Sequence, residues 1–373
     1  MPRLLILCEY PTLLGGERSM LATLPAIAAA GFDIHVAAPP QGPLANALRE
    51  RGIPQIAWPT RDQHDERLPL QALRGSLAES LRRMRPNLIH ANSLSTARIA
   101  GPVAVNCNVR SLGHLRDIVK LARQVVDDLN THRCLVAVSR ATRDFHVAQG
   151  IAPKRCVVIH NGVDLSEFCP RPSTGELHHE LGLPPTAQWI AMVGQLGLRK
   201  GTDVALTAAL QVAPDLPDVH WLVIGERTSN KDESREFEQL LRSIAAEPPL
   251  VGRVHFLGSR NDVPRILNEC VLLVHAARQE PLGRVLLEAA ASGVAVVATD
   301  VGGTREIFPT EADGALLVPP DNFLLMADAI LAILKNDERR RSLAAGARRR
   351  AENAFDIRTS AARLIEQYQN LLM

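Results

Sequence analysis

Short apolar runs alternate with longer amphipathic stretches through the first half of the chain. Each apolar run has the length of a buried strand, and the runs occupy residues 4–8, 34–38, 55–58, 87–91, 109–112, 134–139 and 157–160. Between the first two runs, residues 17–30 have the spacing of a helix, which ends at Gly31. Because strands that alternate with helices form βαβ units, the pattern predicts a mainly parallel sheet.

The alternation stops after residue 164 and then resumes. Pro170, Pro172 and Gly175 punctuate a polar stretch, which we interpret as a linker between two domains. The second series of apolar runs predicts strands at residues 189–193, 220–224, 254–257, 271–275, 295–299 and 315–318. Helices are predicted between these strands, and two more close the chain at residues 327–335 and 357–372. The chain is therefore predicted to consist of two similar α/β halves.

Composition is that of an ordinary globular protein. Hydrophobic residues make up 46% and charged residues 22% of the 373 positions, and the net charge is only +2. No apolar run reaches the roughly 18 residues that a membrane span needs, and the first run, followed by Glu9, favours a core strand over a signal peptide. The six cysteines include no C-x-x-C pair, which indicates buried reduced thiols in a cytoplasmic protein and no metal site.

The segment at residues 271–303 carries the clearest candidate chemistry. A predicted strand at 271–277 leads through a loop at 278–283 into a helix that starts near Arg284. Glu280 lies in the loop and Glu288 in the helix, with seven residues between them. Ligands of open α/β sheets bind at the carboxyl ends of strands, and the free N–H groups of a helix start suit a phosphate. Since ionised carboxylates accept hydrogen bonds from hydroxyls, the segment points to a nucleotide sugar.

Two glycine-containing turns also follow predicted strands. Gly15 and Gly16 come directly before the first helix, where the backbone can approach a ligand closely. The dinucleotide fingerprint G-x-G-x-x-G is absent, and the second strand ends without an acidic residue, which disfavours a nicotinamide dehydrogenase. The second turn, VGQLGLRKG at residues 193–201, does not fit a Walker A loop, but its Lys200 can neutralise a diphosphate as a point charge.

These motifs resemble those of the retaining glycosyltransferases of family four, the group 1 glycosyltransferases. Glu280 and Glu288 match the family's E-x7-E motif within EPLGRVLLEAAASG. The turn at 193–201 is similar to the family's G-R-L-x3-K-G element: Lys200 matches the lysine, whereas Gln195 stands where the family has arginine. Residues 137–168 look like the family's segment that joins the two domains, and residues 256–267 resemble the part that contacts the nucleobase.

The resemblance implies a role for each matching residue. Glu280 would accept hydrogen bonds from sugar hydroxyls and Glu288 from the ribose diol, while Lys200 faces the diphosphate. His114, in SLGHLRD, would lie near the donor sugar and help to stabilise positive charge at the anomeric carbon. Arg260 would flank the base, largely through backbone groups. The residues assigned to catalysis are Glu280, Lys200 and His114, and those assigned to donor binding are Glu288, Gln195, Gly283, Arg284, Val285, Leu282, Arg260, Gly15 and Gly16.

The fold implied is GT-B, an α/β architecture of two Rossmann-like doubly wound domains facing across a cleft. We expect an acceptor-side domain at residues 1–165, a donor-binding domain at 166–355, and a last helix at 356–373 that packs back on the first domain. The resemblance further implies transfer of a hexosyl unit with retention of configuration, from a UDP-, GDP- or ADP-sugar, without a metal or other cofactor. The acceptor, whether glycan, lipid-linked or a small molecule, is left open by the sequence, as is the oligomeric state.

Three alternatives differ in what they predict. A nucleotide-sugar epimerase of the same fold would consume its substrate without an acceptor. A catalytically weak nucleotide-sugar binding protein, suggested by Gln195, would bind the donor without transfer. Nucleic-acid binding is disfavoured, because aromatic residues are only 3% of the chain and no basic face is evident. A peripheral contact with the inner face of a membrane would suit a lipid-linked acceptor and the amphipathic helix predicted at residues 70–84, but packing of that helix against the core is the favoured explanation.

Overall fold

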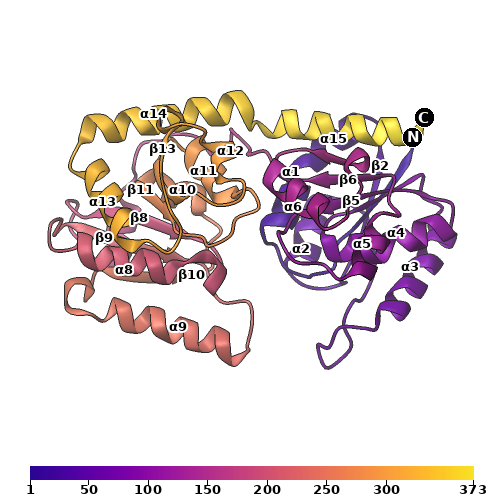
Figure 1. The fold of residues 1–373 in the computed structure, drawn as a ribbon, viewed down its shortest axis with the longest axis horizontal. Helices are drawn as coiled ribbons and strands as arrows, with labels where there is room; N and C mark the ends of the chain where they lie inside the picture. Colours follow the sequence, from indigo (N-terminus) through magenta and orange to yellow (C-terminus); the bar gives the residue numbers. More distant parts are fainter. The chain divides into compact units, whose positions relative to one another are not determined.

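A computed structural model describes all residues, 1–373, and divides them into two compact units. Unit 1 contains residues 1–162 and 357–373, and unit 2 contains residues 163–356. The chain therefore passes from one unit to the other twice, and its last helix belongs to the same unit as its first strand (Figure 1). No helix is both long enough and apolar enough to cross a membrane.

Unit 1 is a parallel seven-stranded sheet in the order β3-β2-β1-β4-β5-β6-β7 with helices on both faces. Its strands are β1 (Arg3–Leu7), β2 (Asp33–Ala38), β3 (Gln55–Ala57), β4 (Leu88–Ala91), β5 (Arg110–Leu115), β6 (Cys134–Ala137) and β7 (Cys156–Val158). Its helices are α1 (Gly15–Ala29), α2 (Pro43–Glu50), α3 (Leu70–Met84), α4 (Leu94–Asn106), α5 (Arg123–Leu129), α6 (Arg140–Ala148) and α15 (Ile357–Leu372), with a 3-10 turn η1 (Pro153–Arg155).

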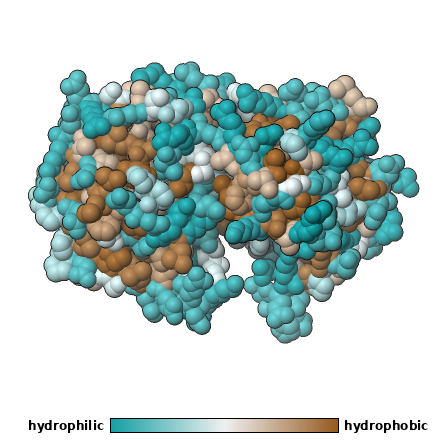
Figure 2. Space-filling model, in the orientation of Figure 1, coloured by the Kyte–Doolittle hydropathy of each residue, from teal (hydrophilic) through white to brown (hydrophobic).

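The alternation of side chains along β1 explains the two helical layers of unit 1. Leu4 and Ile6 pack with α1, α2 and α15, whereas Leu5 and Leu7 pack with α3, α4 and α5. Because successive side chains of a strand point to opposite faces, a run that is apolar throughout must be covered on both sides. The polar loop at residues 61–67, between β3 and α3, projects from unit 1 in Figure 1 and forms the hydrophilic knob at the lower edge of Figure 2.

Unit 2 is a parallel six-stranded sheet in the order β10-β9-β8-β11-β12-β13. Its strands are β8 (Gln188–Val193), β9 (Val219–Ile224), β10 (Val254–Gly258), β11 (Cys270–His275), β12 (Ala295–Thr299) and β13 (Ala315–Val318). Its helices are α7 (Glu176–Leu181), α8 (Thr202–Val212), α9 (Asp232–Ala245), α10 (Val263–Glu269), α11 (Arg284–Ala291), α12 (Thr304–Ile307), α13 (Phe323–Leu334) and α14 (Asp337–Ala354), with 3-10 turns η2 (Leu198–Lys200), η3 (Pro248–Leu250) and η4 (Glu311–Asp313).

The predicted α/β fold class of two Rossmann-like sheets is confirmed, and every strand predicted from an apolar run is present. The helix predicted at residues 17–30 begins two residues earlier, at Gly15, and the helix predicted at 327–335 begins at Phe323. Helix α14 holds two arginine triplets, at residues 339–341 and 348–350, and its bounds were not predicted, because only four of its residues are buried and its apolar pattern is weak. The acceptor and donor roles given to the two halves stay predictions.

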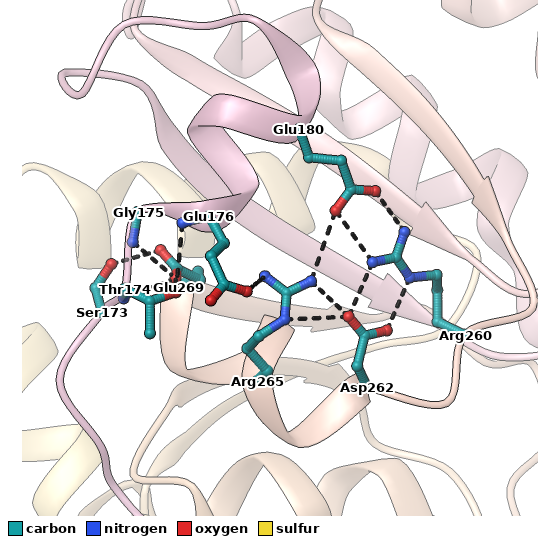
Figure 3. Close-up of polar contacts among 9 residues, drawn as sticks. All are labelled: Ser173, Thr174, Gly175, Glu176, Glu180, Arg260, Asp262, Arg265 and Glu269. Atoms are coloured by element: carbon teal, nitrogen blue, oxygen red, sulfur yellow. Dashed lines mark hydrogen bonds and ion pairs between the residues drawn. The ribbon is translucent and has the colours of Figure 1, made fainter.

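A buried carboxylate ties the segment that enters unit 2 to the body of that unit. Glu269, at the end of α10, is 8% exposed and accepts hydrogen bonds from Ser173 Oγ, from Thr174 Oγ1 at 2.8 Å and from the backbone N–H groups of Thr174 and Gly175 at 2.9 and 3.1 Å (Figure 3). Burial opposes ionisation, but these hydrogen bonds outweigh it and hold the pKa of Glu269 below its ordinary value of 4.5.

We predict that Glu269→Gln lowers the free energy of unfolding of unit 2 by about 1 kcal/mol at pH 7, because the amide keeps the geometry but loses the charge-assisted part of these hydrogen bonds. Since the folded pKa lies below the unfolded one, the carboxylate stabilises above pH 4.5 and this contribution is lost as pH falls through the folded pKa. Urea unfolding at neutral and acidic pH measures both effects. Equal midpoints for wild type and variant at pH 7 would contradict this role of Glu269.

Candidate active site

The candidate site of unit 2 lies where the strand order of its sheet reverses. β8 and β11 are neighbours at the centre of the sheet, and the chain proceeds from β8 to β9 on one side and from β11 to β12 on the other. All the strands are parallel, so the loops after β8 and β11 leave the same edge. This is the topological switch point at which open α/β sheets bind their ligands.

Glu280 is the centre of a buried polar cluster at this edge. Its Oε2 atom lies 2.5 Å from Lys200 Nζ and 2.9 Å from His275 Nε2, and the residue is 5% exposed. Burial alone would raise the pKa of Glu280, but the charge of Lys200 and the hydrogen bond from His275 hold it well below the usual range. Burial also lowers the pKa of His275, so a neutral imidazole donates its Nε2 hydrogen to an ionised carboxylate.

This arrangement leaves one oxygen of Glu280 for a ligand. Lys200 and His275 both donate to Oε2, and Oε1 makes no hydrogen bond within the chain. An ionised carboxylate oxygen held in place in this way accepts hydrogen bonds from hydroxyls. His275 is a residue that the sequence reasoning missed, because it ends an apolar run and has no motif of its own.

Glycine positions allow the turn after β8 to approach β11. Gly201 has a φ of +63°, and a Cβ atom there would lie 1.9 Å from the carbonyl oxygen of Ala276. The backbone N–H of Arg278 also donates to the carbonyl of Arg199 at 2.9 Å. Only glycine fits such a contact between two backbones, and the contact brings Lys200 to Glu280.

The start of α11 supplies a second part of the site. Gly283 precedes it with a φ of +105°, and no side chain caps the first turn, so the N–H groups of Arg284 and Val285 have no partner within the helix. Glu288 is 8% exposed and accepts a hydrogen bond from Arg284 Nε at 2.5 Å. The side chain of Leu282 is fully buried, so only its backbone can face a ligand. A helix start of this kind binds anions.

Two predicted donor-binding residues have their side chains engaged elsewhere. The exposed Gln195 donates to Thr228 Oγ1 in the loop after β9. Arg260 lies between Glu180 and Asp262, with its Nε 2.8 Å from Asp262 Oδ1 and its NH1 2.5 Å from Glu180 Oε1 (Figure 3). These carboxylates occupy the guanidinium, so a contact of Arg260 with a base is left to its backbone, and that contact stays a prediction.

The candidate site residues of unit 1 lie at the carboxyl edge of its sheet. His114, in β5, lies 3.3 Å from Arg116 NH2 through its Nδ1. Arg116 also donates to the carbonyl and the side-chain oxygen of Asn92, both at 2.8 Å, and Asn92 donates to the carbonyl of Gly16. Gly15 and Gly16 begin α1 beside this group. The structure thus brings His114 and Gly16 together through Arg116 and Asn92, which the sequence analysis did not single out.

Comparison with known proteins bears on both units. Residues 173–350 match the family described as glycosyl transferases group 1, and residues 14–167 match the family described as glycosyltransferase family 4. The chain belongs to the group 1 glycosyltransferases. The two matches together span nearly the whole chain, including every residue predicted for the site.

Curated proteins share moderate identity with this chain. A lipopolysaccharide core biosynthesis mannosyltransferase, LpsB, of Rhizobium meliloti is 30% identical over 217 residues, which are 58% of this chain and 61% of that protein. A UDP-Gal:alpha-D-GlcNAc-diphosphoundecaprenol alpha-1,3-galactosyltransferase of Escherichia coli is 24% identical over 82% of this chain and 81% of its own length. The chain spans about half to three-fifths of the length of the first curated relatives it matches.

Solved structures show the same fold. Anabaena Alr3699/HepE in complex with UDP and glucose superposes with a TM-score of 0.86, at 21% identity, over 99% of this chain and 100% of that one. WaaG, a glycosyltransferase involved in lipopolysaccharide biosynthesis, superposes with a TM-score of 0.74 at 18% identity over 98% of this chain and 99% of that one. These likenesses establish the GT-B class of two Rossmann-like sheets for this chain.

We predict that Lys200 and Glu280 are strongly coupled in a double-mutant cycle of unfolding. Lys200→Met leaves a buried carboxylate with His275 alone, and Glu280→Gln leaves the ammonium unpaired, so each single change costs about 3 kcal/mol. The double variant Lys200→Met/Glu280→Gln should cost less than the sum by about 1–3 kcal/mol, measured by urea unfolding at pH 7.

A second lysine–carboxylate pair in unit 2 provides the matched control. Lys335 Nζ lies 2.5 Å from Asp215 Oδ2, the same distance as in the Lys200–Glu280 pair, but both side chains are about half exposed. Exposed pairs couple by less than about 1 kcal/mol. Equal coupling energies in the two cycles would show that burial does not strengthen the Lys200–Glu280 pair.

Proposed function

We propose that the chain is a retaining glycosyltransferase that moves a hexosyl unit from a nucleoside-diphosphate sugar to a hydroxyl acceptor. The observation that carries the proposal is the buried cluster of Lys200, Glu280 and His275 beside the uncapped start of α11. It combines a fixed carboxylate for sugar hydroxyls with a cation and N–H groups for a diphosphate. The complexes of Anabaena HepE with UDP and with UDP-glucose support a donor of this class.

Several groups at this edge of the sheet have separate roles in the proposed transfer. The bond between the anomeric carbon and the diphosphate oxygen breaks, and the acceptor oxygen forms the new bond on the same face of the sugar. Lys200 and the N–H groups of Arg284 and Val285 stabilise the negative charge that develops on the leaving diphosphate. Glu280 holds the sugar through its hydroxyls, Glu288 holds the ribose diol, and the leaving phosphate takes the acceptor proton.

The named relatives bear on the acceptor. The relatives from Rhizobium meliloti and Escherichia coli are named for lipopolysaccharide core and diphosphoundecaprenol substrates, which supports a glycan or lipid-linked acceptor. A cytoplasmic location, a peripheral contact with the membrane and a reaction without a metal stay predictions.

A panel of nucleotides tests the proposed donor site. We expect UDP, GDP or ADP, but not NAD, to raise the melting temperature by a few degrees, because ligand at a hundred times its Kd stabilises by about 2.7 kcal/mol. Glu288→Ala should abolish the shift. Glu352→Ala is the control, since Glu352 pairs with Arg348 one turn earlier just as Glu288 pairs with Arg284, but on α14.

Turnover then distinguishes transfer from the alternatives. With the matching sugar nucleotide and an acceptor, we expect product with retained configuration, and a kcat reduced about tenfold to a hundredfold in Glu280→Gln. Conversion of the donor in the absence of acceptor would identify an epimerase. Binding without any conversion would identify a nucleotide-sugar binding protein. A wild type that none of the diphosphates stabilises would remove the proposal altogether.

Gln195 generates a separate prediction about donor affinity. An amide donor at this position lacks the charge of the family's arginine, so Gln195→Arg should lower the Kd for the preferred nucleoside diphosphate about fivefold, as expected for about 1 kcal/mol from a charge-assisted hydrogen bond. The gain should diminish as salt is raised. Gln195→Met, which has neither donor nor charge, should weaken binding. A Gln195→Arg affinity equal to wild type at low salt would mean that this position does not face the diphosphate.

A further inference from the structure

His275 is a buried histidine at the end of β11 that has no role in the steps of the proposed transfer. Its Nε2 atom lies 2.9 Å from Glu280 Oε2, and the two residues are 4% and 5% exposed. Lys200 Nζ lies 2.5 Å from the same oxygen. Two donors of different kinds, an imidazole and an ammonium, therefore hold one oxygen of the carboxylate.

The hydrogen bond between His275 and Glu280 has only one possible direction. The charge of Lys200, 2.5 Å from Oε2, keeps Glu280 ionised. An ionised carboxylate only accepts hydrogen bonds, so His275 donates the hydrogen on its Nε2. Burial lowers the pKa of His275, and the charge of Lys200 lowers it further, so the imidazole is neutral at pH 7. His275 is thus a neutral donor to an anion.

Lys200 has two anions to serve when a diphosphate binds. In the ligand-free chain its ammonium pairs with Glu280, and its side chain is 18% exposed. The proposed function gives the same ammonium to the leaving diphosphate. Since one charge then divides its attraction between two anions, a closer contact with the diphosphate weakens the contact with Glu280. A buried carboxylate that loses its partner is strongly destabilised, so Glu280 needs another donor at that moment.

No other cation of the loops after β8 and β11 contacts the carboxylate of Glu280. Arg278 and Arg284 are paired with carboxylates of their own. Arg199 is exposed, and its guanidinium contacts the carbonyl of Gln279 at 3.4 Å. The imidazole is therefore the one donor that remains on Oε2 when the ammonium turns away.

We propose that His275 is a positioning residue that holds Glu280 in place while Lys200 turns to the diphosphate. The inference rests on the proposed glycosyl transfer for the identity of that anion, but its ligand-free part can be measured without it. In the free chain the two donors share the carboxylate. In the complex the imidazole holds Oε2, the ammonium is shared with the diphosphate, and Oε1 of Glu280 keeps its position for sugar hydroxyls.

Two substitutions separate the donor of His275 from its ring. The amide nitrogen of glutamine lies about as far from the backbone as Nε2 of histidine, whereas that of the shorter asparagine reaches only the place of Nδ1. His275→Gln therefore keeps a neutral donor toward Glu280. His275→Asn is similarly polar but removes that donor.

Nucleotide affinity tests the role of His275 in the complex. We expect His275→Asn to raise the Kd of whichever of UDP, GDP and ADP binds the wild type about threefold to tenfold, because Lys200 must then hold Glu280 as well. His275→Gln should stay within about twofold of the wild-type Kd, since it keeps the donor. Glu280→Gln frees the ammonium and should lower the Kd. In His275→Asn/Glu280→Gln the Kd should equal that of Glu280→Gln alone. Titration calorimetry measures all four values.

Lys200→Met reproduces, without ligand, the state in which the ammonium has left Glu280. His275→Asn should therefore lower the urea midpoint more in the Lys200→Met chain than in the wild type, and His275→Gln should not. His178→Asn is the matched control. His178 Nε2 donates to the carbonyl of Ala187 at 3.0 Å, directly before β8 at the opposite edge of the same sheet. This variant should shift the midpoint equally in both backgrounds and leave the Kd unchanged.

The unfolding results decide the inference without any ligand. Equal midpoint shifts of His275→Asn in the two backgrounds overturn it, because the histidine would then act independently of Lys200. If Lys200→Met/His275→Asn does not fold while Lys200→Met/His275→Gln does, the inference is supported. If neither folds, a donor at this position does not suffice, and the inference fails.

The affinities separate the inference from the proposed function. A Kd that rises from Glu280→Gln to His275→Asn/Glu280→Gln as much as from wild type to His275→Asn overturns the inference, because the effect would not pass through Glu280. If none of the three nucleotides binds the wild type, the proposed function fails, and the unfolding measurements alone decide the role of His275.

Discussion

The arrangement of unit 2 depends on one buried charge, the carboxylate of Glu280. An ion removed from water costs several kcal/mol unless partners satisfy it, and Glu280 is 5% exposed. Lys200 comes from the turn after β8 and His275 from the end of β11, so satisfying the charge fixes two loops together. The carbonyl of Glu280 also accepts from the N–H of Gly303, in the loop after β12. The contacts that keep the carboxylate ionised therefore also hold together the loops at the carboxyl edge of the sheet.

The two units use the same kind of sheet edge for different chemistry. In unit 2 the cations Lys200 and Arg284 are paired with Glu280 and Glu288. The proposed diphosphate would there meet cations already oriented by carboxylates, together with the N–H groups of a helix start. In unit 1 the edge holds neutral imidazoles and Arg116, whose pKa falls to about 10 through burial. Such an edge offers oriented hydrogen-bond groups of neutral imidazoles beside a single buried guanidinium.

The sequence alone was sufficient to predict those elements and residues that a short stretch of neighbouring residues identifies. Strands buried on both faces are apolar throughout, so β1 and β11 could be predicted from their continuous apolar runs alone. The E-x7-E spacing likewise indicated Glu280 and Glu288 before any contact was known. His275 could not be predicted as their partner, because its position in an apolar run resembles that of any strand residue. The pairing of the Arg260 guanidinium with carboxylates could not be predicted either, since one of its two partners, Glu180, lies 80 residues away in the sequence.

The order of the elements along the chain explains why the last helix matters to the first unit. The chain leaves unit 1 after residue 162 and returns at residue 357, where a Cβ atom on Gly162 would lie 2.4 Å from the Cα atom of Ile357. From this close contact α15 runs along α1 and buries Leu364 and Tyr368 in the core of unit 1. Without α15, His90 Nδ1 would lose its contact with the hydroxyl of Tyr368, and the part of the apolar surface of α1 that packs on α15 would be uncovered. Unit 1 therefore completes both its core and this contact only when the last residues of the chain are in place.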